Sequence, residues 1–241
     1  MTITSSPTTA LGVEPDQPQQ DVANGERPES QPSNEGALDA LMLTSLMSSK
    51  LCHDLVNPIG ALASGLDVLE DSDDDKEMQE EALALLKSSA DKATALLKFA
   101  RVAYGLSGGL DTEVGYDEVR SLLDGLYAHT KATLDWQVQG ASAPKTHAKA
   151  LMIMVQTAAE SVPRGGVVTV SGEAGRFRMT ATGDRVLLND AVGAALSGVS
   201  TDLMPKCSPL FLVGTMAREQ GGKASAALED GVATFELVMP V

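Results

Sequence analysis

Leucines recur at helical spacing through two consecutive stretches of the chain, which are separated by an acidic run. From Leu51 to Leu69 successive leucines lie three, four or seven residues apart, and the pattern extends from Leu38 to about residue 70. An aspartate-rich run, residues 71–75, interrupts the pattern, which then resumes to about Tyr104. Apolar residues at this spacing are typical of amphipathic helices. The sequence therefore predicts an antiparallel helical hairpin with a tight acidic turn.

The predicted hairpin carries an apolar stripe that its own two helices leave half exposed. A second copy of the hairpin supplies a matching stripe, and two such hairpins pack as a four-helix bundle. We therefore predict a homodimer whose interface lies within residues 37–105.

The chain after the hairpin mixes helical and strand-like segments. Glycines at 105, 108 and 109 indicate a linker, residues 106–114, before this second part begins. Helical patterns cover about 116–129, 145–161 and 209–220, and strand patterns cover 133–138, 167–170, 176–181, 223–228 and 232–238. This order predicts a two-layer α/β sandwich over residues 115–241, and an α+β fold class for the whole chain.

The first 36 residues differ from both parts. They are rich in Pro, Gln, Ser, Glu and Asn, and their scattered apolar residues cannot offset the entropy lost on folding. We therefore predict a disordered tail over residues 1–36.

Charge and composition exclude several classes of partner. The chain has 33 acidic and 18 basic residues, a formal net charge of −15, and no basic cluster that would bind nucleic acid or an anionic membrane. It contains two cysteines, Cys52 and Cys207, without a paired motif, and no export signal or membrane-spanning run. We therefore expect a cytoplasmic protein without a metal site, since adjacent helical residues such as Cys52 and His53 diverge by about 100°.

A proline inside the first predicted helix marks the most informative segment. Pro58 lacks a backbone N–H and clashes with the preceding turn, so it should bend the helix just past His53. On a helical projection His53 lies about 200° from Leu55, nearly opposite the leucine stripe, and should face solvent. Asn57, one turn later, should lie on the same face as His53.

Histidine at such a position suits transient phosphoryl transfer. Neutral imidazole is a competent nucleophile near neutral pH, and its phosphoramidate is reactive enough to pass the group on. Asp54 can accept the N–H of the opposite ring nitrogen and hold the useful tautomer, and Asn57 can donate to a phosphoryl oxygen. His129 and His147 have no comparable context and are interpreted as ordinary residues.

Small and exposed neighbours of His53 would let a partner protein approach closely. The predicted docking residues are Ser49, Lys50, Cys52, Val56, Gly60, Ala61 and Ser64.

The segment around His53 resembles the H box of sensor histidine kinases, in which His and an acidic residue precede Asn or Thr and Pro. The residues that carry this resemblance are His53-Asp54-Leu55-Val56-Asn57-Pro58. The hairpin resembles the dimerisation and histidine-phosphotransfer domain of these kinases, and residues 115–241 resemble their Bergerat-like ATP-binding domain.

The ATP-binding motifs of that family are not matched. Thr157 stands where the kinases place a magnesium-binding Asn, and Ala181 stands where they place the adenine-binding Asp. Residues 206–210 replace a glycine-rich loop whose backbone amides would bind phosphates. Glu160 alone matches an acidic kinase residue. These departures predict that the chain binds no ATP.

A kinase-like chain with an intact H box and no nucleotide motifs is similar to the ChpT-type histidine phosphotransferases of alphaproteobacterial cell-cycle phosphorelays. The resemblance rests on residues 50–55 and 158–166 as well as on the H box. It implies that the receiver domain of a hybrid histidine kinase, which holds its own Mg²⁺, phosphorylates His53 of a homodimer. His53 then phosphorylates response regulators.

Two alternatives stay open at this point. An ATP-dependent histidine kinase with altered motifs would label itself from ATP alone. A non-catalytic adaptor that binds receiver domains would work equally well after His53→Ala.

Overall fold

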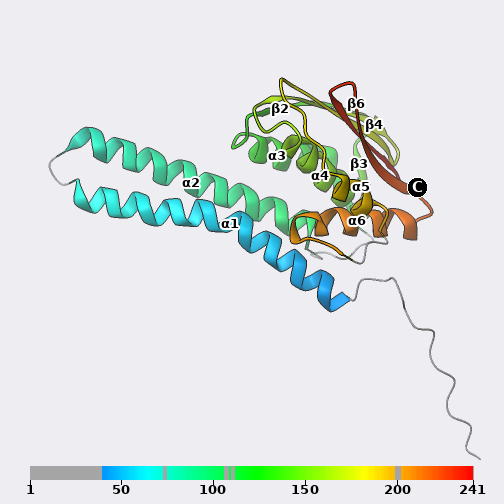
Figure 1. The fold of residues 1–241 in the computed structure, drawn as a ribbon, viewed down its shortest axis with the longest axis horizontal. Helices are drawn as coiled ribbons and strands as arrows, with labels where there is room; N and C mark the ends of the chain where they lie inside the picture. The colour runs from blue at the N-terminus through cyan, green and yellow to red at the C-terminus, as the bar shows by residue number, and fades with distance from the viewer. Residues whose placement is uncertain (1–39, 73–74, 106–108, 110–111, 199–201, 241) are drawn as a thin grey trace, which may run out of the picture. The chain divides into compact units, whose positions relative to one another are not determined.

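The helical hairpin is the first element of the computed structural model, which describes residues 40–72, 75–105, 109, 112–198 and 202–240. Helix α1 (Ala40–Asp71) and helix α2 (Lys76–Ala103) lie side by side and antiparallel (Figure 1). They pack closely at Gly65, where an added Cβ would meet the side chain of Leu86 at 3.0 Å. The predicted tail and most of the predicted linker lie outside the described residues.

Pro58 is buried inside α1. Figure 1 shows that α1 changes direction between its blue first part and its cyan second part. A bend of this kind is the expected consequence of an internal proline, which removes one helical hydrogen bond.

Asp75 caps the start of α2. Its Oδ1 accepts a hydrogen bond from the backbone N–H of Met78 at 3.1 Å. We expect Asp75→Ala to lower the free energy of unfolding by about 1 kcal/mol, because a donor of the first turn loses its partner. Asp75→Asn keeps an acceptor and should stay within about 0.5 kcal/mol of the wild type. Urea unfolding at one fixed protein concentration measures both, and equal stabilities of the two variants would contradict the capping role.

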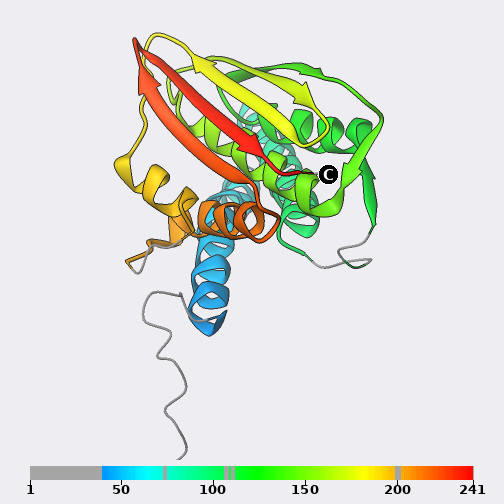
Figure 2. The same cartoon turned by 90° about the vertical axis from the view of Figure 1, so that its right-hand side faces the viewer.

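The second part of the described chain is a two-layer α/β sandwich, as predicted (Figure 2). Its sheet has the strand order β2-β4-β5-β7-β6, in which β2 and β4 are parallel and the other pairs are antiparallel. The strands are β2 (Ala132–Val138), β4 (Gly166–Glu173), β5 (Arg176–Thr182), β6 (Lys223–Glu229) and β7 (Val232–Val238). The helices are α3 (Tyr116–Tyr127), α4 (Lys145–Glu160), α5 (Asp190–Leu196) and α6 (Ser208–Glu219).

One face of the sheet is buried and the other is polar, as alternation along the strands predicts. Val170, Met179 and Phe235 form one buried row across β4, β5 and β7. Arg178 and Glu236, which pair on the opposite face, are exposed.

Helix α4 lies at the centre of the fold. Most of its residues are buried, including Leu151, Met152, Ile153 and Met154 on successive faces. A helix that is apolar all round needs cover on every side, and here the sheet, α3, α6 and the hairpin provide it. The C-terminal end of α4 is thereby fixed next to the hairpin.

The base of the hairpin packs against the α/β domain. Phe99 and Ala103 of α2 belong to the same apolar core as α4, and Leu43 and Leu46 of α1 pack against it. The Lys149 ammonium of α4 donates to the backbone carbonyl oxygen of Gly105 at 2.7 Å. Burial, with a further contribution from the Lys145 charge, lowers the pKa of Lys149. Apolar and polar contacts thus join the two parts.

The sequence patterns did not predict four short elements. Strand β1 (Glu113–Gly115) pairs with β3 (Ser142–Pro144), so residues 113 and 114 belong to the α/β domain and not to the predicted linker. Helix α5 and the 3-10 turn η1 (Pro205–Cys207) were not predicted. The elements β1, β3 and η1 have three residues each, and the seven residues of α5 make about two helical turns, so none of them contains enough apolar repeats to show its period. Within the described residues, none of the helices has the length and apolarity needed to cross a bilayer.

Candidate functional site

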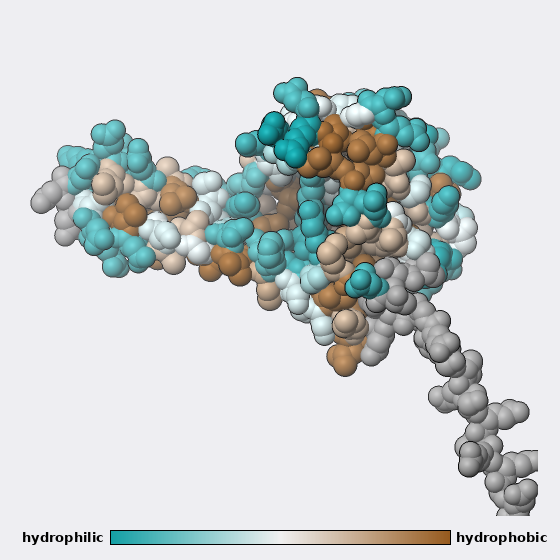
Figure 3. Space-filling view, viewed as in Figure 1, coloured by the Kyte–Doolittle hydropathy of each residue, from teal (hydrophilic) through white to brown (hydrophobic). Residues whose placement is uncertain are grey.

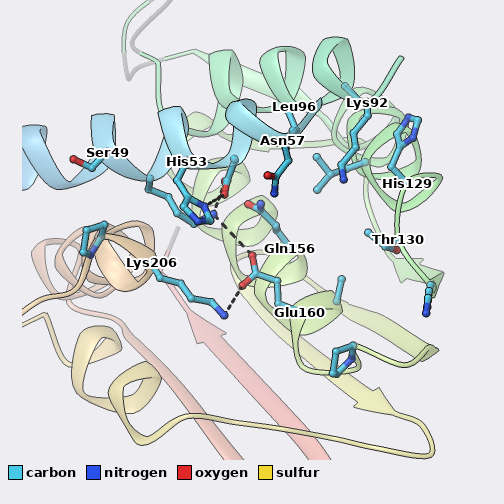
Figure 4. Close-up of a pocket in the computed structure, with 18 of the residues that line it drawn as sticks. Ser49, His53, Asn57, Lys92, Leu96, His129, Thr130, Gln156, Glu160 and Lys206 are labelled. Atoms are coloured by element: carbon cyan, nitrogen blue, oxygen red, sulfur yellow. Dashed lines mark hydrogen bonds and ion pairs between the residues drawn. The ribbon is translucent and has the colours of Figure 1, made fainter. Parts of the chain in front are cut away.

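His53 lies on α1 at the wall of a cleft between the hairpin and the α/β domain (Figure 4). Its side chain is 83% exposed, as the helical projection predicts. The cleft has a volume of about 1040 Å³. It is lined by Ser49, Lys50, His53, Asp54, Asn57, Lys92, Ala95, Leu96, Leu126, His129, Thr130, Lys131, Gln156, Ala159, Glu160, Pro163, Met204, Pro205 and Lys206.

Asp54 faces the imidazole without a hydrogen bond to it. Asp54 Oδ1 lies 3.6 Å from His53 Nδ1, which is beyond hydrogen-bond distance and within the range of an ion pair. Its other oxygen, Oδ2, accepts a hydrogen bond from the Lys50 ammonium. The predicted Asp54–imidazole bond is therefore not made in this structure, and Lys50 holds the carboxylate instead.

Lys50 was a predicted docking residue, but its side chain is only 9% exposed. Its ammonium contacts Asp54 on its own helix and lies 4.0 Å from Glu160 Oε1, at the end of α4. Glu160 Oε2 lies 3.6 Å from the Lys206 ammonium of η1. Lys50 is therefore part of a contact between the two parts of the chain and offers little free surface to a partner.

Asn57 and Gln156 both point into the cleft, from α1 and α4 respectively (Figure 4). The hydroxyl of Tyr104 donates a long hydrogen bond of 3.4 Å to Gln156 Oε1. Burial raises the pKa of the Tyr104 phenol, and the carboxylates of Asp54 and Glu160 raise it further. The Tyr104 phenol therefore stays protonated and interacts electrostatically with both carboxylates.

The other predicted docking residues occupy two environments. Ser49 is exposed and lines the cleft. Ala61 is half-buried, whereas Cys52, Val56, Gly60 and Ser64 are exposed on α1, and none of these five residues lines the cleft.

The residues that stand in place of the nucleotide motifs are engaged within the fold or buried. The Thr157 hydroxyl donates to the backbone carbonyl oxygen of Ile153 at 2.9 Å, so it is turned onto its own helix. Ala181 is fully buried and offers no acceptor in its side chain. Lys206 lies in η1 and reaches Glu160.

The cleft contains basic residues that were not predicted from the sequence to belong to the site. Lys92, His129 and Lys131 line it together with Lys50 and Lys206, although the chain as a whole is strongly acidic. No spacing rule joins residues of α2, the loop after α3 and η1, so only the fold brings them together. Among the described residues, no group of three His, Cys, Asp or Glu side chains could hold a metal ion.

Known proteins resemble this chain in sequence and in fold. A family model described as the histidine phosphotransferase C-terminal domain matches residues 116–231. Protein phosphotransferase ChpT of Brucella abortus (strain 2308) is 34% identical over 150 residues, which cover 61% of this chain and 70% of that protein. A 1.7 Å structure of a bacterial phosphotransferase is 29% identical and has a TM-score of 0.73, with 83% of this chain and 98% of that chain covered. The catalytic domain of the histidine kinase ThkA is more distant, with 17% identity, a TM-score of 0.41, and 54% of this chain and 95% of that chain covered. The match to ChpT, together with the phosphotransferase fold, shows that this chain belongs to the ChpT-type histidine phosphotransferases, which carry phosphoryl groups in phosphorelays.

Proposed function

We propose that His53 is the residue that carries the phosphoryl group, received from the aspartate of a receiver domain and passed to the aspartates of response regulators. The observation that supports this role most is the placement of the ring. His53 is exposed on the cleft wall, and its Nδ1 faces the Asp54 carboxylate. This orientation leaves Nε2 as the nitrogen with a free lone pair for attack.

The transfer is a displacement at phosphorus. His53 Nε2 attacks the phosphorus of the aspartyl phosphate, the new P–N bond forms, and the bond from phosphorus to the aspartate oxygen breaks. The receiver aspartate leaves as a carboxylate, while the proton on Nδ1 stays in place. The ring becomes positively charged, and the Asp54 carboxylate at 3.6 Å offsets that charge. The second transfer is the reverse of this step with a different receiver.

The cleft suits an acidic partner. Lys92, Lys131 and Lys206 line it, and the acidic site of a receiver domain would meet these cations. Asn57 can donate to a phosphoryl oxygen from its place one turn after His53. We expect Mg²⁺ to be held by the receiver, whose carboxylates supply oxygen ligands. The receiver of a hybrid histidine kinase is the proposed donor, and response regulators are the proposed acceptors.

The α/β domain is proposed to be a histidine-kinase ATPase-like fold that no longer binds ATP. Thr157, which is bonded to its own helix, and the apolar Ala181 support this part of the proposal. Catalysis by this chain then consists of positioning and charge, without a bound cofactor.

The hairpin is proposed to form a four-helix bundle with a second copy. Exposed large apolar residues concentrate on α1 and α2, and Figure 3 shows some of them as brown patches on the hairpin. Each outer face of such a bundle would carry one His53. We further propose a cytoplasmic role in a cell-cycle phosphorelay. The exposed free thiol of Cys52 suits a reducing compartment.

A transfer assay with purified proteins tests the proposed route. The wild-type protein is mixed with a receiver domain labelled on its aspartate, and separately with labelled ATP and Mg²⁺. We expect an acid-labile, base-stable adduct from the receiver and none from ATP. Label from ATP alone would make the protein a kinase. No label from any receiver, together with receiver binding, would favour the adaptor alternative.

A further inference from the structure

Four side chains of alternating charge connect the α/β domain to the proposed phosphoacceptor. In order they are Lys206 on η1, Glu160 at the end of α4, and Lys50 and Asp54 on α1. In Figure 4 a dashed line marks the contact between Glu160 and Lys206. We call Lys50, Glu160 and Lys206 the charge clasp.

Burial decides which contact of the charge clasp matters most. The Lys50 side chain is 9% exposed, and a buried ammonium is costly unless carboxylates face it. Among the residues that the structure describes, Asp54 and Glu160 are the carboxylates that face it. Lys206 is 73% exposed, so solvent screens its contact with Glu160 and its contribution is small.

The orientation of Asp54 depends on Lys50. One carboxylate oxygen of Asp54 accepts from the Lys50 ammonium, and the other faces His53 Nδ1 at 3.6 Å. A shift of Lys50 therefore turns the carboxylate relative to the imidazole. Glu160 is the group of the α/β domain that attracts Lys50 from the other side.

We propose that Glu160 is a positioning residue for phosphoryl transfer at His53, acting through Lys50 on the orientation of Asp54. This role rests on the proposed function of His53. It gives the α/β domain a part in the reaction that needs no nucleotide, because the domain sets the position of the carboxylate beside the ring.

Loss of Glu160 has a defined consequence in this arrangement. With Glu160→Gln, Asp54 becomes the remaining carboxylate beside the buried Lys50 ammonium, and it must balance that charge alone. The carboxylate then interacts less with Nδ1, so a smaller fraction of the ring carries its proton there. The tautomer with a free Nε2 becomes less populated, and transfer slows.

The experiment compares Glu160→Gln with Glu219→Gln in the full-length chain. Each glutamate is the last residue of its helix, α4 or α6, so any effect of removing charge from a helix end is matched. We expect Glu160→Gln to lower the rate of transfer from a phosphorylated receiver by about 3- to 10-fold, and Glu219→Gln to leave it unchanged. The ¹⁵N shifts of the His53 ring at fixed pH should report less Nδ1-protonated tautomer in Glu160→Gln alone.

Adding Glu160→Gln to a Lys50→Met variant distinguishes a positioning role of Glu160 from a general effect on folding. Lys50→Met replaces the buried ammonium with an apolar chain of similar length, which a protein interior accepts. In the Lys50→Met background, Glu160→Gln should have no further effect on the rate or on the ring shifts, because its route through Lys50 is gone.

The proposal for Glu160 fails if Glu160→Gln leaves the ¹⁵N shifts of the His53 ring unchanged, or if it slows transfer equally in the wild-type and Lys50→Met backgrounds.

Failure of the proposed function of His53 gives a different result. In that case His53→Gln would still accept label, while the His53 ring shifts of the wild type and of Glu160→Gln would continue to report whether Glu160 orients Asp54.

Discussion

A His53→Gln variant is expected to accept no phosphoryl group from a labelled receiver domain, a loss of more than about a hundredfold in transfer rate. Glutamine has no ring nitrogen with a nucleophilic lone pair, so the P–N bond cannot form. Because the side chain is 83% exposed, its replacement disturbs little packing, and the fold should be retained. Transfer is measured by rapid mixing, and folding by circular dichroism and binding of the unphosphorylated receiver.

His129→Gln is the matched control for this prediction. The chain has three histidines, and His129 is the one that lines the same cleft as His53. No acidic residue stands next to it in the sequence as Asp54 does for His53, and its replacement should keep the transfer rate within about threefold of wild type. Equal loss in both variants would assign the effect to the cleft surface and not to a phosphohistidine. Full transfer by His53→Gln would remove His53 from the reaction.

Much of the fold follows from the sequence because its elements are long. The two hairpin helices, α4 and the strands β4, β5 and β7 carry enough apolar repeats to define a period. Strand β1 has three residues, and its pairing with β3 depends on residues far along the chain. Such short elements form because the rest of the fold supplies their pairing partner, so no local sequence pattern predicts them.

The candidate site, too, could be predicted from the sequence only in part. Projection of α1 alone is enough to place His53 on the solvent side and Asn57 beside it. Lys50 has the same charged, helix-forming character as any surface lysine, and a projection of one helix leaves it exposed. Its burial depends on the fold, which places η1 and α6 against α1 and brings Glu160 to 4.0 Å from the Lys50 ammonium. The role proposed for Glu160 could therefore be inferred only from the fold.

The second large expected effect concerns the proposed homodimer. Ile59 and Leu66 on α1 lie seven residues apart, as do Leu83, Ala90 and Leu97 on α2. The close approach of Gly65 to Leu86 sets the antiparallel alignment, which places Leu66 near the level of Leu83. Leu66 is 51% exposed and Leu83 is 54% exposed. In the proposed bundle, these residues of two neighbouring helices would form one apolar seam that faces the second copy.

Leu66→Glu combined with Leu83→Glu should convert the proposed dimer to a monomer. Each half-exposed leucine contributes about 1 kcal/mol when the interface covers it, and a dimer loses four of them. The dissociation constant should therefore rise by about a thousandfold before any repulsion between the new carboxylates is counted. Sedimentation equilibrium over a range of concentrations measures this change. Leu187→Glu is the control, because Leu187 is 46% exposed but lies on the α/β domain. If the seam variant stays dimeric, or the wild type is a monomer at every concentration, the bundle is not the means of assembly, since a seam of this size cannot bind a second copy through two buried charges per chain.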